Sequence, residues 1–132
     1  MVADETLAMS VRAEQLLRTA LSFASEEQVP FALFRLGDCF RGRALISESL
    51  ADADTAVQFT QDSLEAIDRD HFQYPSGLAF SADCLLVRSC LQPDEASKTA
   101  DTQAAMEFCK KAFRSAITSS AEGVVSYFHI HR

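Results

Sequence analysis

The stretch from Phe31 to Ile67, FALFRLGDCFRGRALISESLADADTAVQFTQDSLEAI, decides the fold of this chain. Apolar residues recur at intervals of three and four in each half of the stretch, which is the spacing of an amphipathic helix. A polar segment, Ser47 to Asp54, separates the two halves, and it contains Asp52 and Asp54, either of which can cap the second helix. The pattern therefore predicts two antiparallel helices joined by a loop over residues 47–54.

Pro30 and Gly37 characterise the first of these helices. Proline is favoured in the first turn, because the N–H that it lacks has no partner at a helix start. A glycine inside a helix costs about 1 kcal/mol relative to alanine, so we expect Gly37 to let a neighbouring backbone come close. Ala56, Thr60 and Ser63 place small side chains on one face of the second helix. We predict that these small residues form the seam between the two helices.

A second copy of this pattern follows after 45 residues in the first helix of the pair and after 49 residues in the second. The four additional residues fall in the segment from Gln92 to Ala100, which we predict to be a loop, because loops tolerate insertions best. The chain is therefore predicted to contain two related helical hairpins. The matched residues include Pro30 and Pro75, Asp38-Cys39 and Asp83-Cys84, Ala56 and Ala105, Phe59 and Phe108, and Thr60 and Cys109.

The whole chain is predicted to be a single all-α domain of about five helices plus a short C-terminal segment. Its 132 residues are enough for one core and too few for two. The last residues, Val124 to Arg132, fit either a short helix or a strand, and we expect the helix. The predicted parts are a flanking helix over residues 4–24, a hairpin over 30–68, a second hairpin over 76–118, a linker over 119–123 and a terminal segment over 123–132.

Charge and composition exclude several classes of partner. The formal net charge of −7 argues against nucleic acid, because phosphate binding needs clustered Lys and Arg. Asp4 and Glu5 stand where a secretory signal would be basic, and no apolar run approaches the roughly 20 residues that span a bilayer. We therefore expect a cytoplasmic protein with no membrane partner, whose four cysteines are reduced.

The segment Leu36-Gly37-x-x-Phe40, followed by a helix with small residues on one face, resembles the tetratricopeptide repeat. That repeat usually has about 34 residues, and the longer spacing here is more similar to the long-armed arrays of fungal CHAT-domain proteins. Asp70-His71-x-x-x-Pro75 resembles the segment before each first helix of those arrays, and residues 119–129 resemble their closing segment. The resemblance implies antiparallel hairpins stacked as a short solenoid, whose first helices line a groove for a peptide or helix.

No residue set has the spacing of a catalytic or metal centre. Cys39 and Cys84 lie one repeat apart, too far for a disulfide in a stacked array, and we expect them to be packing residues. His129 and His131 have no third ligand near them in the sequence, and His71 lies in a polar loop, where capping or solvation is expected. We therefore expect no enzyme activity, no cofactor and no metal.

The function expected from the sequence is a non-enzymatic protein-protein interaction scaffold or adaptor. Its partner is expected to be a protein or peptide, and the terminal helices can also support self-association. A thiol-based redox or metal-responsive regulatory fragment of a longer repeat protein is the alternative. The groove residues predicted from the first helices are Arg35, Asp38, Arg41, Arg43, Asp83 and Arg88.

Overall fold

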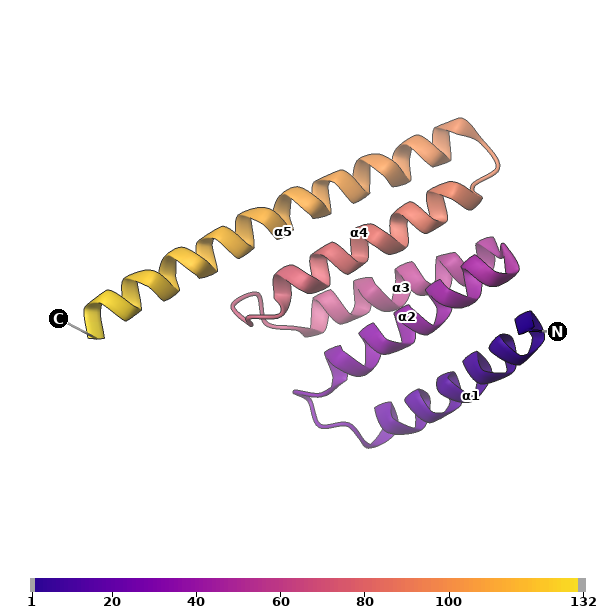
Figure 1. Cartoon of the computed structure of the whole chain (residues 1–132), viewed down its shortest axis with the longest axis horizontal. Coiled ribbons are helices and arrows are strands. Elements are labelled where there is room, and N and C mark those ends of the chain that lie inside the picture. Colours follow the sequence, from indigo (N-terminus) through magenta and orange to yellow (C-terminus); the bar gives the residue numbers. More distant parts are fainter. Residues whose placement is uncertain (1, 131–132) are drawn as a thin grey trace.

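Five α-helices, each running opposite to the one before it, make up the described part of the chain (Figure 1). The computed structural model describes the backbone of residues 2–130 and the side chains of residues 4–118. The predicted all-α class and number of helices are confirmed. In chain order the helices are α1 (Val2–Phe23), α2 (Val29–Ser47), α3 (Leu50–Ala66), α4 (Tyr74–Leu91) and α5 (Glu95–Ile130).

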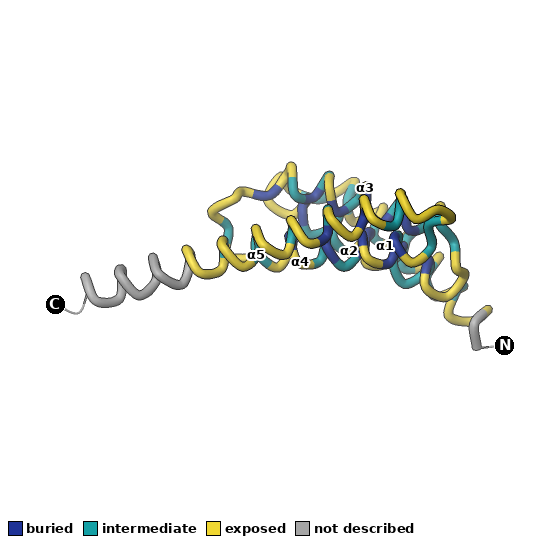
Figure 2. Tube along the Cα trace, turned by 90° about the horizontal axis from the view of Figure 1, so that it is seen from above, coloured by how far each residue is buried: buried dark blue, intermediate teal, exposed yellow. Residues whose placement is uncertain are grey.

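Each helix packs mainly against its neighbours in the sequence, so the helices follow one another across the molecule from α1 to α5 (Figure 1). Among the described helices, one further contact joins α2 to α4, which run in the same direction. Buried residues concentrate in the middle of the stack, where Leu36 and Leu78 are among the largest fully buried side chains (Figure 2). The core therefore belongs mainly to α2, α3 and α4.

The seam between α2 and α3 is made of small residues, as predicted. A Cβ atom at Gly37 would lie 3.0 Å from Cγ2 of Thr60 and 3.5 Å from the carbonyl oxygen of Ala56, so the glycine lets the two helices approach. Thr60 and Ser63 are buried. The hydroxyl of Ser63 donates a hydrogen bond to the carbonyl oxygen of Pro30, which ties the start of α2 to the end of α3.

The connection between α2 and α3 is shorter than the loop predicted over residues 47–54. Only Glu48 and Ser49 separate the two helices. Glu48 has a left-handed φ of 52° and ends α2. The hydroxyl of Ser49 accepts a hydrogen bond of 3.2 Å from the N–H of Asp52, so Ser49 is the N-cap, and not Asp52 or Asp54. The polar residues that indicate a loop in the sequence belong instead to the first turn of α3.

The turn of the second hairpin is also shorter than the loop predicted over residues 92–100. The carboxylate of Asp94 accepts hydrogen bonds from the N–H and the hydroxyl of Ser97, at 2.9 and 2.8 Å. Asp94 therefore caps α5, which begins at Glu95. Cap-forming residues and loop residues have similar compositions, which is why the sequence pattern places this helix start too late.

α5 is much longer than predicted. It continues through residues 119–123, where the sequence predicts a linker, and it ends at Ile130 instead of leaving a separate terminal segment. The helix extends well beyond the ends of α3 and α4 (Figure 1). The backbone of residues 124–130 is helical, as expected, and not a strand, whereas residues 131 and 132 lie outside the described residues. Gly123, in the predicted linker, costs the helix only about 1 kcal/mol relative to alanine, which is too little to end it.

Matched positions of the two first helices are buried alike. α4 begins at Tyr74, two residues before the start predicted at residue 76, and carries Pro75 in its first turn as α2 carries its own proline. Phe40 and its counterpart Leu85 are both buried. At this matched pair the two helices therefore have the same burial.

Candidate functional site

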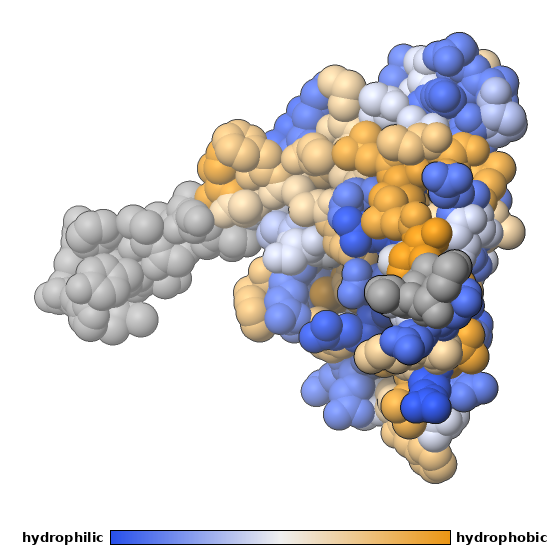
Figure 3. Space-filling view, turned by 45° about the vertical axis from the view of Figure 1, so that its right-hand side comes forward, coloured by the Kyte–Doolittle hydropathy of each residue, from blue (hydrophilic) through white to orange (hydrophobic). Residues whose placement is uncertain are grey.

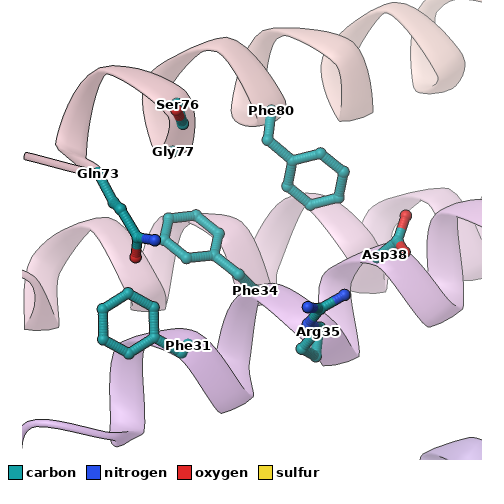
Figure 4. A pocket seen from close by; sticks show the side chains of 8 residues that line it. All are labelled: Phe31, Phe34, Arg35, Asp38, Gln73, Ser76, Gly77 and Phe80. Atoms are coloured by element: carbon teal, nitrogen blue, oxygen red, sulfur yellow. The ribbon is translucent and has the colours of Figure 1, made fainter.

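A pocket lies between the first helices of the two hairpins, where α2 meets α4 (Figure 4). Its volume is about 370 Å³. Phe31 and Phe34 from α2 and Phe80 from α4 line it, and their rings come together between the two helices. The ring centroids of Phe34 and Phe80 are 6.3 Å apart in an edge-to-face arrangement. Half-buried aromatic rings in an open pocket favour an apolar ligand group.

The shape of this pocket depends on Gly77. A Cβ atom at Gly77 would lie 2.5 Å from Cζ of Phe34, so a side chain at this position and the present ring position exclude each other. Gln73, the residue before α4, and Ser76, in the first turn of α4, complete this side of the pocket. The glycine therefore allows the Phe34 ring to lie directly on the backbone of α4.

Four of the six groove residues predicted from the sequence lie together on the α2–α4 face. Arg35 and Asp38 line the pocket. One turn further along α2, Nη2 of Arg41 lies 2.8 Å from the carboxylate of Asp83 on α4, and Nη1 lies 3.9 Å from that of Asp38. These side chains are partly exposed, so the ion pair contributes little to stability. It places fixed charges of both signs beside the aromatic lining.

The other two predicted groove residues, Arg43 and Arg88, lie outside the pocket and connect helices. Nη2 of Arg43 pairs with Glu14 of α1 at 2.8 Å. Arg88 pairs with Asp101 of α5 at 2.8 Å and with Asp54 of α3 at 3.3 Å. Both arginines occupy the same position in their hairpins, and both reach the helix that precedes their hairpin. Their guanidinium groups are therefore engaged in holding the stack together.

A second hollow, of about 540 Å³, adjoins the pocket at Phe31, which lines both. Glu26 and Glu27, from the turn before α2, and Asp68, which follows α3, contribute its acidic lining. None of these three carboxylates forms an ion pair within the part of the chain whose side chains are described. The ring of His71 lies 5.4 Å from that of Phe31, between centroids, and forms part of the same hollow. The aromatic pocket therefore adjoins uncompensated negative charge.

The four thiols have different surroundings. Burial raises the pKa of Cys84 to about 12, so this thiol is protonated at neutral pH and is a poor nucleophile. Cys39 is half-buried, with its Sγ 3.2 Å from the carbonyl oxygen and 3.3 Å from the hydroxyl of Ser10 on α1. Cys90 and Cys109 are exposed.

The histidines do not form a metal site in the described residues. Nδ1 of His71 accepts a hydrogen bond of 3.0 Å from the N–H of Gln73, within the turn that precedes α4, and no side chain caps α4 itself. Among the described side chains, no three from His, Cys, Asp and Glu are grouped as metal ligands. The pair of His129 and His131 lies outside the described side chains. No helix in the described range is both long and apolar enough to cross a membrane.

No protein-family model, no curated protein and no solved structure matches this chain.

The aromatic lining is the part of the site that the sequence pattern does not reveal. Phenylalanines at helical spacing look like core residues, but among the described side chains only Phe40 is buried. Six of the eight pocket residues differ from the residue at the matched position of the other hairpin, whereas Gln73 matches Gln28 and Asp38 matches Asp83. At the offset of 45 residues, the pocket residues pair as Phe31 with Ser76, Ala32 with Gly77, Phe34 with Ala79 and Arg35 with Phe80.

Proposed function

We propose that this chain is a non-enzymatic protein-interaction module, which binds a peptide or helix of another protein in the pocket between α2 and α4. The observation that carries the proposal is an open pocket lined by three phenylalanine rings from two different helices. Covering apolar surface yields about 25 cal/mol per Å², so an apolar side chain that fills the pocket is a source of affinity. The Phe34 ring lies against Gly77 and the Phe80 ring, and the Phe31 ring lies against His71, so the lining is in place before the ligand arrives.

The charges around the pocket define the chemistry of the ligand. The acidic hollow beside Phe31 has no cationic partner of its own among the described side chains, whereas Asp38 and Asp83 already face Arg41. A lysine or arginine close in sequence to the apolar anchor would supply the missing charge. The proposed ligand is therefore a short segment with an apolar anchor and a nearby basic residue.

The finer fold that we propose is a short tetratricopeptide-like solenoid. Two observations support it: matched positions such as Phe40 and Leu85 are buried alike, and Arg43 and Arg88 make corresponding contacts. In stacked hairpins the first helices lie side by side and form the binding face. The contact of α2 with α4 is the corresponding arrangement here.

A thiol-based or metal-responsive role is the weaker proposal. It is not favoured by Cys84, whose raised pKa opposes thiolate formation. Mapping of thiol reactivity on the folded chain tests this role. Exposure alone predicts that only Cys90 and Cys109 are modified rapidly.

Selection from a phage-displayed library of random 12-residue peptides tests the binding proposal. The unmodified chain is compared with two pocket variants. Gly77→Leu forces the Phe34 ring into the pocket, and Ser76→Trp fills the pocket from an exposed position without touching the core. Ala51→Leu, at an exposed position of α3 outside both hollows, is the matched control. Circular dichroism confirms that each variant is folded.

We expect peptides that are enriched on the unmodified chain and on Ala51→Leu and that lose at least tenfold in affinity on Ser76→Trp. Enriched sequences should share an apolar residue with Lys or Arg nearby, and their binding should weaken as salt rises. Enrichment that does not depend on the pocket variants, or no enrichment at all, would overturn the proposal.

A further inference from the structure

The exposed face of α5 corresponds to a face of α3 that is covered. At the offset of 49 residues, Val57 of α3 matches Met106 of α5, and Leu64 matches Phe113. Val57 is 3% exposed and Leu64 is half-buried, whereas Met106 is 54% exposed and Phe113 69%. The difference arises because α3 lies between α2 and α4, while α5, among the described helices, packs against α4 alone.

The uncovered apolar side chains of α5 form one stripe. Met106, Phe113 and Ile117 follow each other at intervals of seven and four residues, so they lie on one side of the helix, and all three are at least half exposed. Apolar side chains of α5 are visible at the surface next to the larger group of grey atoms, on the left of Figure 3. Three large apolar side chains aligned in this way are more than the scattered exposure that a surface normally shows.

Charge distinguishes this stripe from the matching face of α3. Where α3 carries Gln61, Asp62 and Glu65, α5 carries Lys110, Lys111 and Arg114 at the matched positions. These are three of the twelve Lys and Arg residues in a chain with a net charge of −7. Lys110 makes only an exposed pair with Glu107 at 3.3 Å, and Arg114 forms no ion pair within the described side chains. Of the three, Lys110 and Arg114 lie beside the stripe, whereas Lys111 lies further round the helix, with its Nζ 5.7 Å from the centroid of the Phe108 ring. The border of the stripe is therefore basic at Lys110 and Arg114.

The interface between α3 and α4 shows what covers such a face. Val57 belongs to the same apolar cluster as Ala82 and Leu85 of α4. At its border, Asp54 of α3 pairs with Arg88 of α4 at 3.3 Å, so the covering helix carries the charge opposite to that of the border. The same rule applied to α5 requires an acidic covering helix.

We propose that the stripe of Met106, Phe113 and Ile117 is a second interaction surface, which binds an amphipathic helix of a partner protein with acidic residues along its flank. The partner helix takes the place on α5 that α4 takes on α3. A second copy of α5 fits this surface poorly, because it would bring two basic borders together. The inference does not depend on the pocket between α2 and α4, which is formed by other helices.

A displayed library of 20-residue amphipathic helices tests this inference. The apolar stripe of the library is fixed, and the flanking positions are randomised among Glu, Gln and Lys. It is selected on the unmodified chain, on an apolar variant (Phe113→Gln with Ile117→Gln) and on a charge-inverted variant (Lys110→Glu, Lys111→Glu and Arg114→Glu). The substituted side chains are exposed, so the variants should fold, and circular dichroism with thermal melting checks this. Ser76→Trp, in the pocket, is the control.

We expect Glu-rich helices from the unmodified chain and from Ser76→Trp, Lys-rich helices from the charge-inverted variant, and at least a tenfold loss of affinity on the apolar variant. No enrichment, or the same flank composition on the unmodified and charge-inverted chains, would overturn the inference. Helices that bind the apolar variant undiminished but fail on Ser76→Trp would also overturn it, and would at the same time support the pocket proposal.

Discussion

α3 and α5 have similar sequences and opposite surroundings. Each is the second helix of a hairpin, and each packs its Ala-x-x-Phe face (Ala56 and Phe59, Ala105 and Phe108) into a common core cluster. α3 has a first helix on both sides, whereas α5 has one neighbour among the described helices. The same pattern of apolar residues is therefore buried in one helix and exposed in the other. Burial in this molecule is decided by the position of a helix in the stack.

This difference divides the roles of the two regions. The faces of α3 stabilise the molecule, because residues such as Thr60 and Val57 contact helices on either side. We expect the outer face of α5 to contribute little to stability, because its apolar side chains are at least half exposed. The substitutions below test whether α3 and α5 differ in their contribution to stability as their surroundings require.

The largest effect is expected from placing a charge at the matched positions Val57 and Met106. Val57→Lys buries an ammonium group without a partner, and we expect it to destabilise the protein by about 3–5 kcal/mol or to prevent folding. Met106→Lys stays in solvent and should change the free energy of unfolding by no more than about 0.5 kcal/mol. Urea denaturation followed by circular dichroism measures both values. Similar large losses for the two variants would mean that the face of α5 is covered in solution.

An intermediate effect is expected at Arg88, which pairs with one carboxylate from each helix. Asp101 of α5 is buried and lies 2.8 Å away, and it also accepts a hydrogen bond from Gln92, so Asp101→Asn should cost about 1–3 kcal/mol. Asp54 of α3 is exposed and 3.3 Å away, so Asp54→Asn should cost less than about 1 kcal/mol. For this contact the substitution in α5 is therefore expected to cost more stability than the substitution in α3, which is the opposite of the order expected at Val57 and Met106. Equal costs in urea denaturation would contradict the structure.

The pKa of Asp101 gives this contact a pH dependence. Burial favours the neutral carboxyl group, but hydrogen bonds from Arg88 and Gln92 and the charge of Arg88 outweigh it, and they lower the pKa of Asp101. A lowered pKa in the folded state contributes stability that is present above the unfolded pKa, near 4, and is lost as the pH falls through the folded pKa. The stability difference between the unmodified chain and Asp101→Asn should therefore be constant above about pH 5 and shrink below pH 4.

The two helix starts are expected to show a smaller effect. α3 is capped by the hydroxyl of Ser49 and α5 by the carboxylate of Asp94. Ser49→Ala should cost about 1 kcal/mol at every pH between 3 and 8, because a hydroxyl does not titrate in this range. Hydrogen bonds from the backbone and side chain of Ser97 lower the pKa of Asp94, so its cap is present at neutral pH and is lost as the pH falls through that lowered pKa.

Amide hydrogen exchange of the first turns measures the two caps separately. The N–H of Ser97 should lose protection in acid, while that of Asp52 keeps it relative to the rest of its helix. Loss of protection at both helix starts in acid would show that the caps do not act as the structure indicates.

The sequence predicts the hairpins well, because their signals are local. Pro30 at a helix start, Gly37 at a close approach and the small seam residues each have one physical reason, and the structure places them accordingly. The predicted turns are too long, because Ser49 and Asp94 are polar residues whose role as caps depends on hydrogen bonds that composition does not show.

The site is harder to predict than the fold, because it depends on which helices meet. Of the predicted groove residues, Arg35 and Arg41 lie on the face between α2 and α4, while Arg43 and Arg88 project toward other helices. Helical spacing shows which residues share a face, but it does not show which neighbour that face contacts. The exposure of Met106 is hard to predict for the same reason. The sequence around Met106 has the same helical pattern as that around buried Val57, and it does not show that no described helix covers this face.

The smallest effect is expected from the two glycines of α2. Apart from its chain neighbours and the backbone of its own helix, no atom lies within 4 Å of the position that a Cβ atom would take at Gly42. Gly42→Ala should therefore stabilise the protein by about 0.5–1 kcal/mol through helix propensity alone. Position 37 matches Ala82 of the second hairpin, so Gly37→Ala gives both hairpins the same residue. The Cβ atom of the new alanine would lie 3.0 Å from Cγ2 of Thr60. The gain in propensity should therefore be reduced or cancelled.

A double-mutant cycle with Thr60→Ser isolates this contact, because serine lacks the methyl group that the new Cβ would meet. Gly37→Ala should be more favourable by about 0.5 kcal/mol or more in the Thr60→Ser background than in the unmodified chain. Gly42→Ala should gain the same amount in both backgrounds, since it touches nothing on α3. If the two glycines respond alike, the seam of α3 is looser than its burial implies, and the contrast between a tightly covered α3 and an open α5 is correspondingly weaker.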